Sequence, residues 1–129
     1  MLRINPSLLP SQVVYPLYDN ANGDNGTITL SDSVTNYEYI EIFYRNNNDD
    51  YASVKVYQPD GKSVTLQNGV MANNATNTRI WLTVTGVTIS GNTITPTDLR
   101  NGQVELKANT AVALTRVNHA YITRVIGYK

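Results

Sequence analysis

The segment from Tyr37 to Tyr57, with the sequence YEYIEIFYR-NNNDD-YASVKVY, decides the fold of this chain. Its two outer runs alternate apolar and polar residues, as strands with one buried face do. The five residues between them, Asn46 to Asp50, are turn formers. We therefore expect an antiparallel hairpin here.

One register of this hairpin, with Arg45 opposite Tyr51, is supported by both of its faces. The apolar face then has the pairs Ile40–Val56, Ile42–Val54 and Tyr44–Ala52. The other face has the opposite-charge pair Glu41–Lys55 and the aromatic pair Tyr39–Tyr57. A slip of one residue would destroy both patterns, so the sequence predicts this register.

The rest of the chain also consists of short runs rich in strand formers, separated by turns rich in asparagine such as Asp19 to Gly26. Further strands are expected at Thr27–Leu30, Thr78–Ser90, Gln103–Lys107 and Tyr121–Tyr128. The last of these is apolar on both faces, which is typical of a central or interface strand. With no convincing amphipathic helix and no internal repeat, this spacing predicts an all-β, antiparallel β-sandwich or barrel.

Three glycines suggest how the strands connect. Gly61 makes Gln58–Lys62 a three-residue hairpin loop, so that Val56 faces Val64, Val54 faces Leu66, and three strands form a meander. Gly86 lies where the inward phase of Ile80, Leu82 and Val84 changes to that of Val87 and Ile89, and a bulge there would restore one inward face. Gly91 predicts a tight turn at Ser90–Thr93, with Ile89 opposite Ile94.

The composition narrows the function classes. The 129 residues suggest one domain, and 10 basic against 10 acidic residues give a formal net charge of zero. Such a chain has no overall field for nucleic acid or an anionic membrane, and little repulsion between copies. It has no cysteine, no apolar signal-peptide core, and no run near the ~18 apolar residues of a membrane helix. We expect a soluble protein without a classical export signal.

The first 18 residues, Met1 to Tyr18, are expected to form an extended arm ahead of a domain at 19–129. Pro6, Pro10 and Pro16 prevent a continuous helix. Several apolar side chains nevertheless need a surface to dock on, in this domain or in another subunit: Leu8, Leu9, Val13, Val14, Tyr15 and Leu17. They are the candidate anchoring residues.

No catalytic, cofactor-binding or metal-binding motif is found, so we expect no enzyme activity and no cofactor. His119 is the only histidine, and no Gly-x-Ser-x-Gly elbow accompanies it. The Asp residues fall mostly in turns, where they cap backbone rather than form an acid pair for glycoside hydrolysis. Asp19–Gly26 is rich in oxygen ligands, but Asn25 stands where a calcium loop needs glycine.

The face opposite the apolar side of the hairpin is rich in aromatic residues. A sheet in a domain of this size needs only one buried face, so this second apolar face is an excess. Its members are expected to be Tyr37, Tyr39, Phe43, Tyr51 and Tyr57. Such a patch marks cover by the same chain, contact with another subunit, or direct binding of sugar by the rings. Trp81, the only tryptophan, points away from Ile80 and Leu82 and is expected at a packing or interface position, with a ligand platform as the alternative.

Three segments of the chain resemble C-terminal domains of tail and fibre proteins from phages of Gram-positive hosts. They are YIEIFYR at 39–45, SVKVYQPDGK at 53–62 and YITRVIGYK at 121–129, and the resemblance spans most of Tyr18–Lys129. It implies a jelly-roll-like knob in three copies, with no catalytic residues. Since the domain here follows only a short arm, it favours a small virion component: a head fibre, a decoration protein or a baseplate tip.

The resulting hypothesis is a virion structural protein, made in the host cytoplasm, that attaches to the host surface or decorates the particle. Its expected partners are other virion proteins, held through the arm, further copies of itself, and a host cell-surface glycan. Binding to nucleic acid and insertion into a membrane are not expected. The alternatives are a free, monomeric carbohydrate-binding module and, third, a small glycan-acting enzyme.

Overall fold

The computed structural model describes residues 13–73, 78–105, 113–115 and 119–129. These residues form nine strands and one short 3-10 turn, Val34–Asn36. The strands are β1 (Val14–Asp24), β2 (Ile28–Thr29), β3 (Tyr39–Arg45), β4 (Tyr51–Tyr57), β5 (Ser63–Asn73), β6 (Thr78–Ser90), β7 (Thr93–Glu105), β8 (Ala113–Thr115) and β9 (Tyr121–Tyr128). The protein is therefore all-β, as the sequence predicts.

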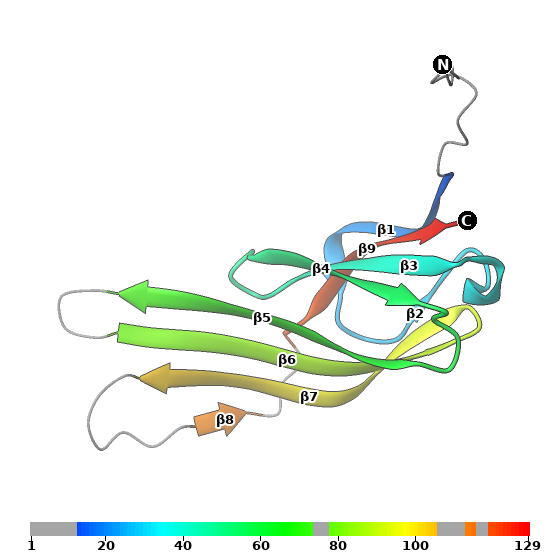
Figure 1. Cartoon of the computed structure of the whole chain (residues 1–129). Coiled ribbons are helices and arrows are strands. Elements are labelled where there is room, and N and C mark those ends of the chain that lie inside the picture. The colour runs from blue at the N-terminus through cyan, green and yellow to red at the C-terminus, as the bar shows by residue number, and fades with distance from the viewer. Residues whose placement is uncertain (1–12, 74–77, 106–112, 116–118) are drawn as a thin grey trace, which may run out of the picture.

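The strands belong to two antiparallel sheets (Figure 1). One has the order β1-β9-β3-β4; the other has the order β2-β7-β6-β5, with β8 beside β7. The hairpins of β5, β6 and β7 extend well beyond the four-stranded sheet, because β6 and β7 have 13 residues each and β3 and β4 only seven.

The predicted register of β3 and β4 is confirmed at every pair, from Tyr39 opposite Tyr57 to Arg45 opposite Tyr51. The segment Tyr121–Tyr128 is also a central strand as expected, since β9 lies between β1 and β3. Seven of its eight residues are buried or half-buried. This burial on both faces of the strand fits its apolar residues on both faces.

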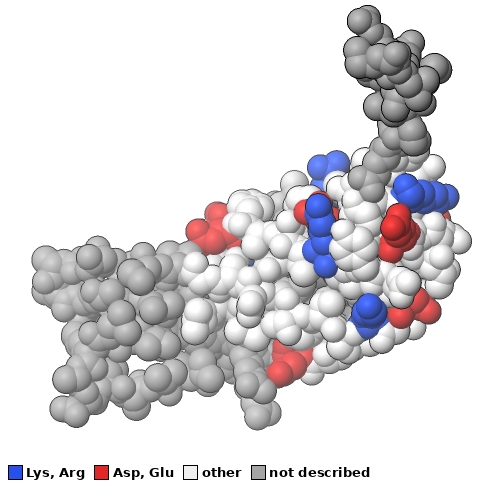
Figure 2. All heavy atoms as spheres, in the orientation of Figure 1, with Lys and Arg blue, Asp and Glu red and all other residues white. Residues whose placement is uncertain are grey.

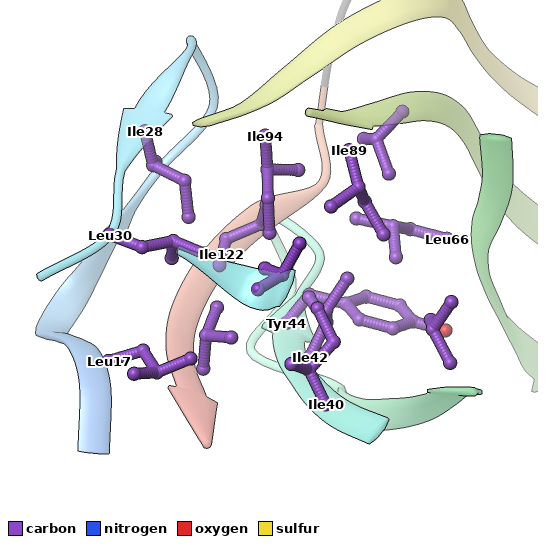
Figure 3. Close-up of a cluster of buried hydrophobic side chains, with 14 of the residues drawn as sticks. Leu17, Ile28, Leu30, Ile40, Ile42, Tyr44, Leu66, Ile89, Ile94 and Ile122 are labelled. Atoms are coloured by element: carbon purple, nitrogen blue, oxygen red, sulfur yellow. The ribbon is translucent and has the colours of Figure 1, made fainter. Parts of the chain in front are cut away.

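The core lies between the two sheets (Figure 3). The four-stranded sheet contributes Ile40, Ile42 and Val125, each fully buried. The facing sheet contributes Leu66, Val87, Ile89 and Ile94, which are also fully buried. Burying a large aliphatic side chain stabilises a fold by about 1.5–3 kcal/mol, so this cluster holds the two sheets together in a sandwich-like arrangement.

The expected three-stranded meander is wrong, because β4 and β5 belong to different sheets. The turn itself forms, with Gly61 at φ +76° and the N–H of Lys62 donating to the carbonyl of Pro59 at 3.1 Å. Gln58, however, has a left-handed φ of +46°, and its N–H donates to the carbonyl of Glu38. The chain thus leaves the first sheet here. Val64 and Leu66 therefore do not pair with β4 but lie across the core from it.

The phase change expected within β6 does not occur. Thr83 and Thr85 share the inner face with Val87 and Ile89, while Leu82 lies on the outer face and is 38% exposed. A bulge does lie at Gly86, but the extra residue belongs to the partner strand: Gly86 pairs with Asp98, and Val87 pairs with Pro96. The turn after β6 is as predicted, with Ile89 opposite Ile94 and Gly91 at φ +56°.

Candidate functional site: the outer face of the four-stranded sheet

The outer face of the four-stranded sheet is the aromatic surface that the sequence predicts, with changed membership. On β3, Tyr39, Glu41 and Phe43 alternate with core residues and point outward. On β4, both Tyr51 and Tyr57 are exposed, at 66% and 56% of their surface. Described charges of both signs are interspersed on the surface visible in Figure 2, without a large patch of one sign.

Three tyrosines from three neighbouring strands form a stack on this face. Tyr39 lies between Tyr57 and Tyr128, with ring centroids 4.8 and 4.5 Å apart and interplanar angles of 29° and 10°. Since strands lie about 4.7–4.9 Å apart, the spacing of the sheet itself produces this stack. Both faces of Tyr39 are therefore covered, and only 8% of the residue remains exposed.

Polar groups next to the stack hold its rings in place. Tyr128 donates from its hydroxyl to Glu41 Oε1 at 3.1 Å, and Ser53 donates to Glu41 Oε2 at 2.9 Å. Burial, together with this bond to Glu41, raises the pKa of Tyr128. Lys55 lies opposite Glu41 as predicted, and its Nζ is 5.9 Å from the centre of the Tyr39 ring. Glu41 and Lys55 are thus opposite each other as predicted. The hydrogen bonds that Glu41 accepts, however, come from the hydroxyl groups of Tyr128 and Ser53.

Arg45 organises the other end of the face. Its guanidinium lies 4.3 Å from the centre of the Tyr121 ring and donates to the carbonyl of Asn22 from Nε at 3.2 Å. It also donates to the carbonyl of Asn46 and forms an ion pair with Asp49 at 3.6 Å. One side chain thus joins the end of β1, the β3–β4 loop and the start of β9.

The sequence pattern predicts Tyr37 on this face, and that prediction is wrong. Tyr37 is in the core cluster, 8% exposed, with its ring 5.6 Å from that of Tyr15. The 3-10 turn Val34–Asn36 precedes it, so the alternation of β3 does not extend back to this residue. Its hydroxyl donates to Asp32 Oδ2 at 2.8 Å; burial and this bond raise the pKa of Tyr37 to about 12.

Tyr128 and Tyr121 were missed as members of the surface. Both come from the last strand, whose register against β3 places Tyr128 opposite Tyr39 and Tyr121 opposite Arg45. Their spacing gives no direct signal, because a bulge between Phe43 and Tyr44 changes the phase between them. The aromatic ends of Tyr121–Tyr128 were the available clue.

The ordered domain begins earlier in the sequence than the expected boundary at residue 19. Strand β1 starts at Val14, and Leu17 is 3% exposed within the core. Tyr15 packs against that core as well and pairs with Gly127 of β9, while the carbonyl of Leu17 accepts from the N–H of Ser31 at 2.9 Å. Both residues therefore belong to the domain. Val13 and Val14 are about half exposed, whereas Leu8 and Leu9 lie outside the described residues.

Trp81 lies in the first part of β6, opposite Val70 and Gln103. Its side chain lies outside what the structure describes, so neither the interface nor the platform interpretation is tested. His119 lies half-buried just before β9, and its Nδ1 has no hydrogen-bond partner among the described residues.

The asparagine and aspartate side chains of the turns bind backbone. Asn20 Oδ1 accepts from the N–H groups of Asn22 and Gly23, and Asp24 Oδ1 accepts from Gly26 at 2.8 Å. Asp60 accepts similarly from Gly91 at 2.8 Å. Within the described ranges, no group of three or more His, Cys, Asp or Glu side chains could hold a metal ion.

A search against protein-family models and a search of curated proteins find no match to this chain. Across the described part of the structure, no helix is long and apolar enough to cross a membrane.

Proposed function

We propose that this chain is a virion structural protein of a phage, as a head fibre, a decoration protein or a tail or baseplate tip. It attaches the particle to the host surface or decorates it, without catalytic activity. The resemblance to tail and fibre domains of phages of Gram-positive hosts suggests this role, with a jelly-roll-like knob in three copies.

One observation carries the proposal. Two of the segments on which the resemblance rests, 39–45 and 121–129, lie 76 or more residues apart in the chain, yet they pair side by side as β3 and β9. The third, 53–62, begins with the adjacent strand β4 and continues into the turn that leaves the sheet. The resemblance therefore covers one connected unit, whose outer face carries the tyrosine stack.

The location of the protein in particles tests this role. Phage particles purified from infected cells by density gradient should contain the chain in a fixed ratio to the major capsid protein, measured by quantitative mass spectrometry. Full-length protein supplied in trans should enter particles, and a variant lacking Met1–Gln12 should not. A chain abundant in the lysate but missing from purified particles would contradict the proposal.

The alternative, a free carbohydrate-binding module, is favoured by the exposed rings of Tyr51 and Tyr57 on one strand. The stack restricts it, because Tyr39 has no free face for a sugar, whereas Tyr57 at one end of the stack is exposed. Calorimetric titration with cell-wall polysaccharide distinguishes the two. Loss of binding in Tyr57→Ala, with binding kept in Val14→Ala on β1, would support the module.

A further inference from the structure

The free edge of β4 is the feature from which we infer a further property. Strand β4 is the last strand of its sheet, and among the described residues no strand lies beside its other edge. Exposed edges are templates for pairing with another chain, so proteins usually block them. The edges of the longer strands β1 and β5 carry such blocks: β1 contains Pro16 and two register shifts, and the backbone of Gln67 in β5 is occupied by the Tyr44 hydroxyl.

The hydrogen-bond alternation shows which groups of β4 are free. Asn46 donates to the carbonyl of Asp50 at 3.1 Å, and Gln58 donates to the carbonyl of Glu38 at 2.9 Å. Because the bonded pairs of an antiparallel ladder occur at every second residue, the even-numbered residues of β4 bond to β3. The backbone N–H and C=O groups of the odd-numbered residues therefore point away from β3, toward the free edge of the sheet. These residues are Tyr51, Ser53, Lys55 and Tyr57.

We propose that β4 pairs antiparallel with β4 of a second copy, about a two-fold axis at Val54. In this register Tyr51 faces Tyr57 of the second copy, Ser53 faces its Lys55, and the reciprocal pairs form on the other side of the axis. All four outward-pointing residues then make hydrogen-bonded pairs. The inference rests on the β4 edge and not on the virion role, and it differs from the proposed function in the number of copies.

The side chains of β4 favour this register over its neighbours. A two-fold axis at Lys55 would place two ammonium groups opposite each other, which is destabilising in a cross-strand pair. An axis at Ser53 would leave Tyr57 opposite Asp49, outside the strand. The axis at Val54 aligns the whole of β4, and places its two exposed tyrosines against each other at both ends.

The pairing would also extend the tyrosine stack. Tyr128, Tyr39 and Tyr57 already lie in one row across the sheet. Tyr51 of the second copy would be next in that row, followed by its Arg45 and Tyr121. A tyrosine buries roughly 150–250 Å² when covered, so four partly exposed rings and two strands form an interface at the small end of the specific range. We therefore expect association at micromolar to submillimolar concentrations.

Disulfide trapping tests the register directly, since the chain has no cysteine. Non-bonded pairs of an antiparallel ladder have Cα atoms about 4.5 Å apart, within the range that a disulfide spans. Val54→Cys should therefore cross-link to itself under mild oxidation at least tenfold faster than Ala52→Cys. Both positions are half-buried and on the same face of β4, so Ala52→Cys is a matched control for Val54→Cys. Equal rates for the two, or faster cross-linking of Lys55→Cys, would overturn the proposed register.

Mass in solution tests the number of copies. The resemblance implies three copies, whereas the β4 edge points to two. Light scattering after size exclusion, loaded at several hundred micromolar, should approach twice the chain mass of 14.3 kDa. Tyr51→Glu should give a monomer with an unchanged circular dichroism spectrum, and Val14→Glu on β1 should remain a dimer. A wild-type mass of one or three chains would overturn the proposal.

Discussion

The hydroxyl of Tyr44 lies against the backbone of Gln67, donating to its carbonyl at 2.7 Å and accepting from its N–H at 3.1 Å. Tyr44 belongs to β3 and Gln67 to β5, so the contact joins the two sheets. One side chain thereby satisfies both backbone groups that Gln67 presents on the free edge of β5. Burial raises the pKa of Tyr44 above its ordinary value.

Replacing Tyr44 by phenylalanine should therefore lower the free energy of unfolding by about 1–2 kcal/mol, since the change removes two hydrogen bonds and leaves the ring in place. Urea unfolding followed by circular dichroism measures this. Tyr51→Phe, which removes a hydroxyl from an exposed ring, is the control and should change stability by less than about 0.5 kcal/mol. Equal stability of the Tyr44 variant and the wild type would show that water replaces the contact.

Gly127 should not tolerate a side chain, because Tyr37 occupies the space beside it. A Cβ on Gly127 would lie 2.5 Å from Tyr37 Cδ1, while one on Gly26 would meet only Asp24 Oδ1, at 3.4 Å. Gly127→Ala should then cost about 1–3 kcal/mol or prevent folding, and Gly26→Ala should be nearly neutral. In a Tyr37→Ala background the added methyl should cost much less. An undiminished cost in that background would mean that Tyr37 is not the obstacle.

The alternation of apolar and polar residues explains both the β3–β4 register that was predicted correctly and the β4–β5 pairing that was not. The β3–β4 register was predictable because both faces of a short hairpin carry a distinct pattern, and every pair tests the others. The step from β4 to β5 was not, since alternation shows which side of a strand is buried and not which strand lies beside it. Val64 and Leu66 meet β4 whether they pair with it or face it across the core.

Two further predictions failed for different physical reasons. The methyl groups of Thr83 and Thr85 allow burial on the inner side of β6, so the apolar Leu82 could lie outside. The aromatic surface was predicted from β3 and β4, the two strands with a confirmed register. Its members from β9 required the β3–β9 register, which depends on contacts more than 70 residues apart.

The stability of the domain should fall as the pH rises from 10 to 12. The folded state holds the proton of Tyr37 with a pKa of about 12, against an ordinary value of 10.0, so it binds that proton more tightly than the unfolded chain does. The contribution is complete below pH 10 and is lost as the pH approaches 12. Melting temperatures of the wild type and Tyr37→Phe should therefore converge over this range. A constant difference between them would contradict this assignment. Tyr44 and Tyr128, whose pKa values are also raised, titrate in both proteins.

The start of β1 predicts how much of the N-terminus the domain needs. Deletion of Met1–Gln12 ends before β1 and should leave the circular dichroism spectrum and the melting temperature nearly unchanged. Deletion of Met1–Tyr18 also removes Leu17 from the core and the first pairs with β9. The loss of one buried leucine alone costs roughly 2–5 kcal/mol, so the longer deletion should unfold the protein. If the shorter deletion unfolds it as well, the first 12 residues form part of the fold rather than an anchor to a neighbouring protein. If neither does, β1 is dispensable and β9 can serve as an edge strand.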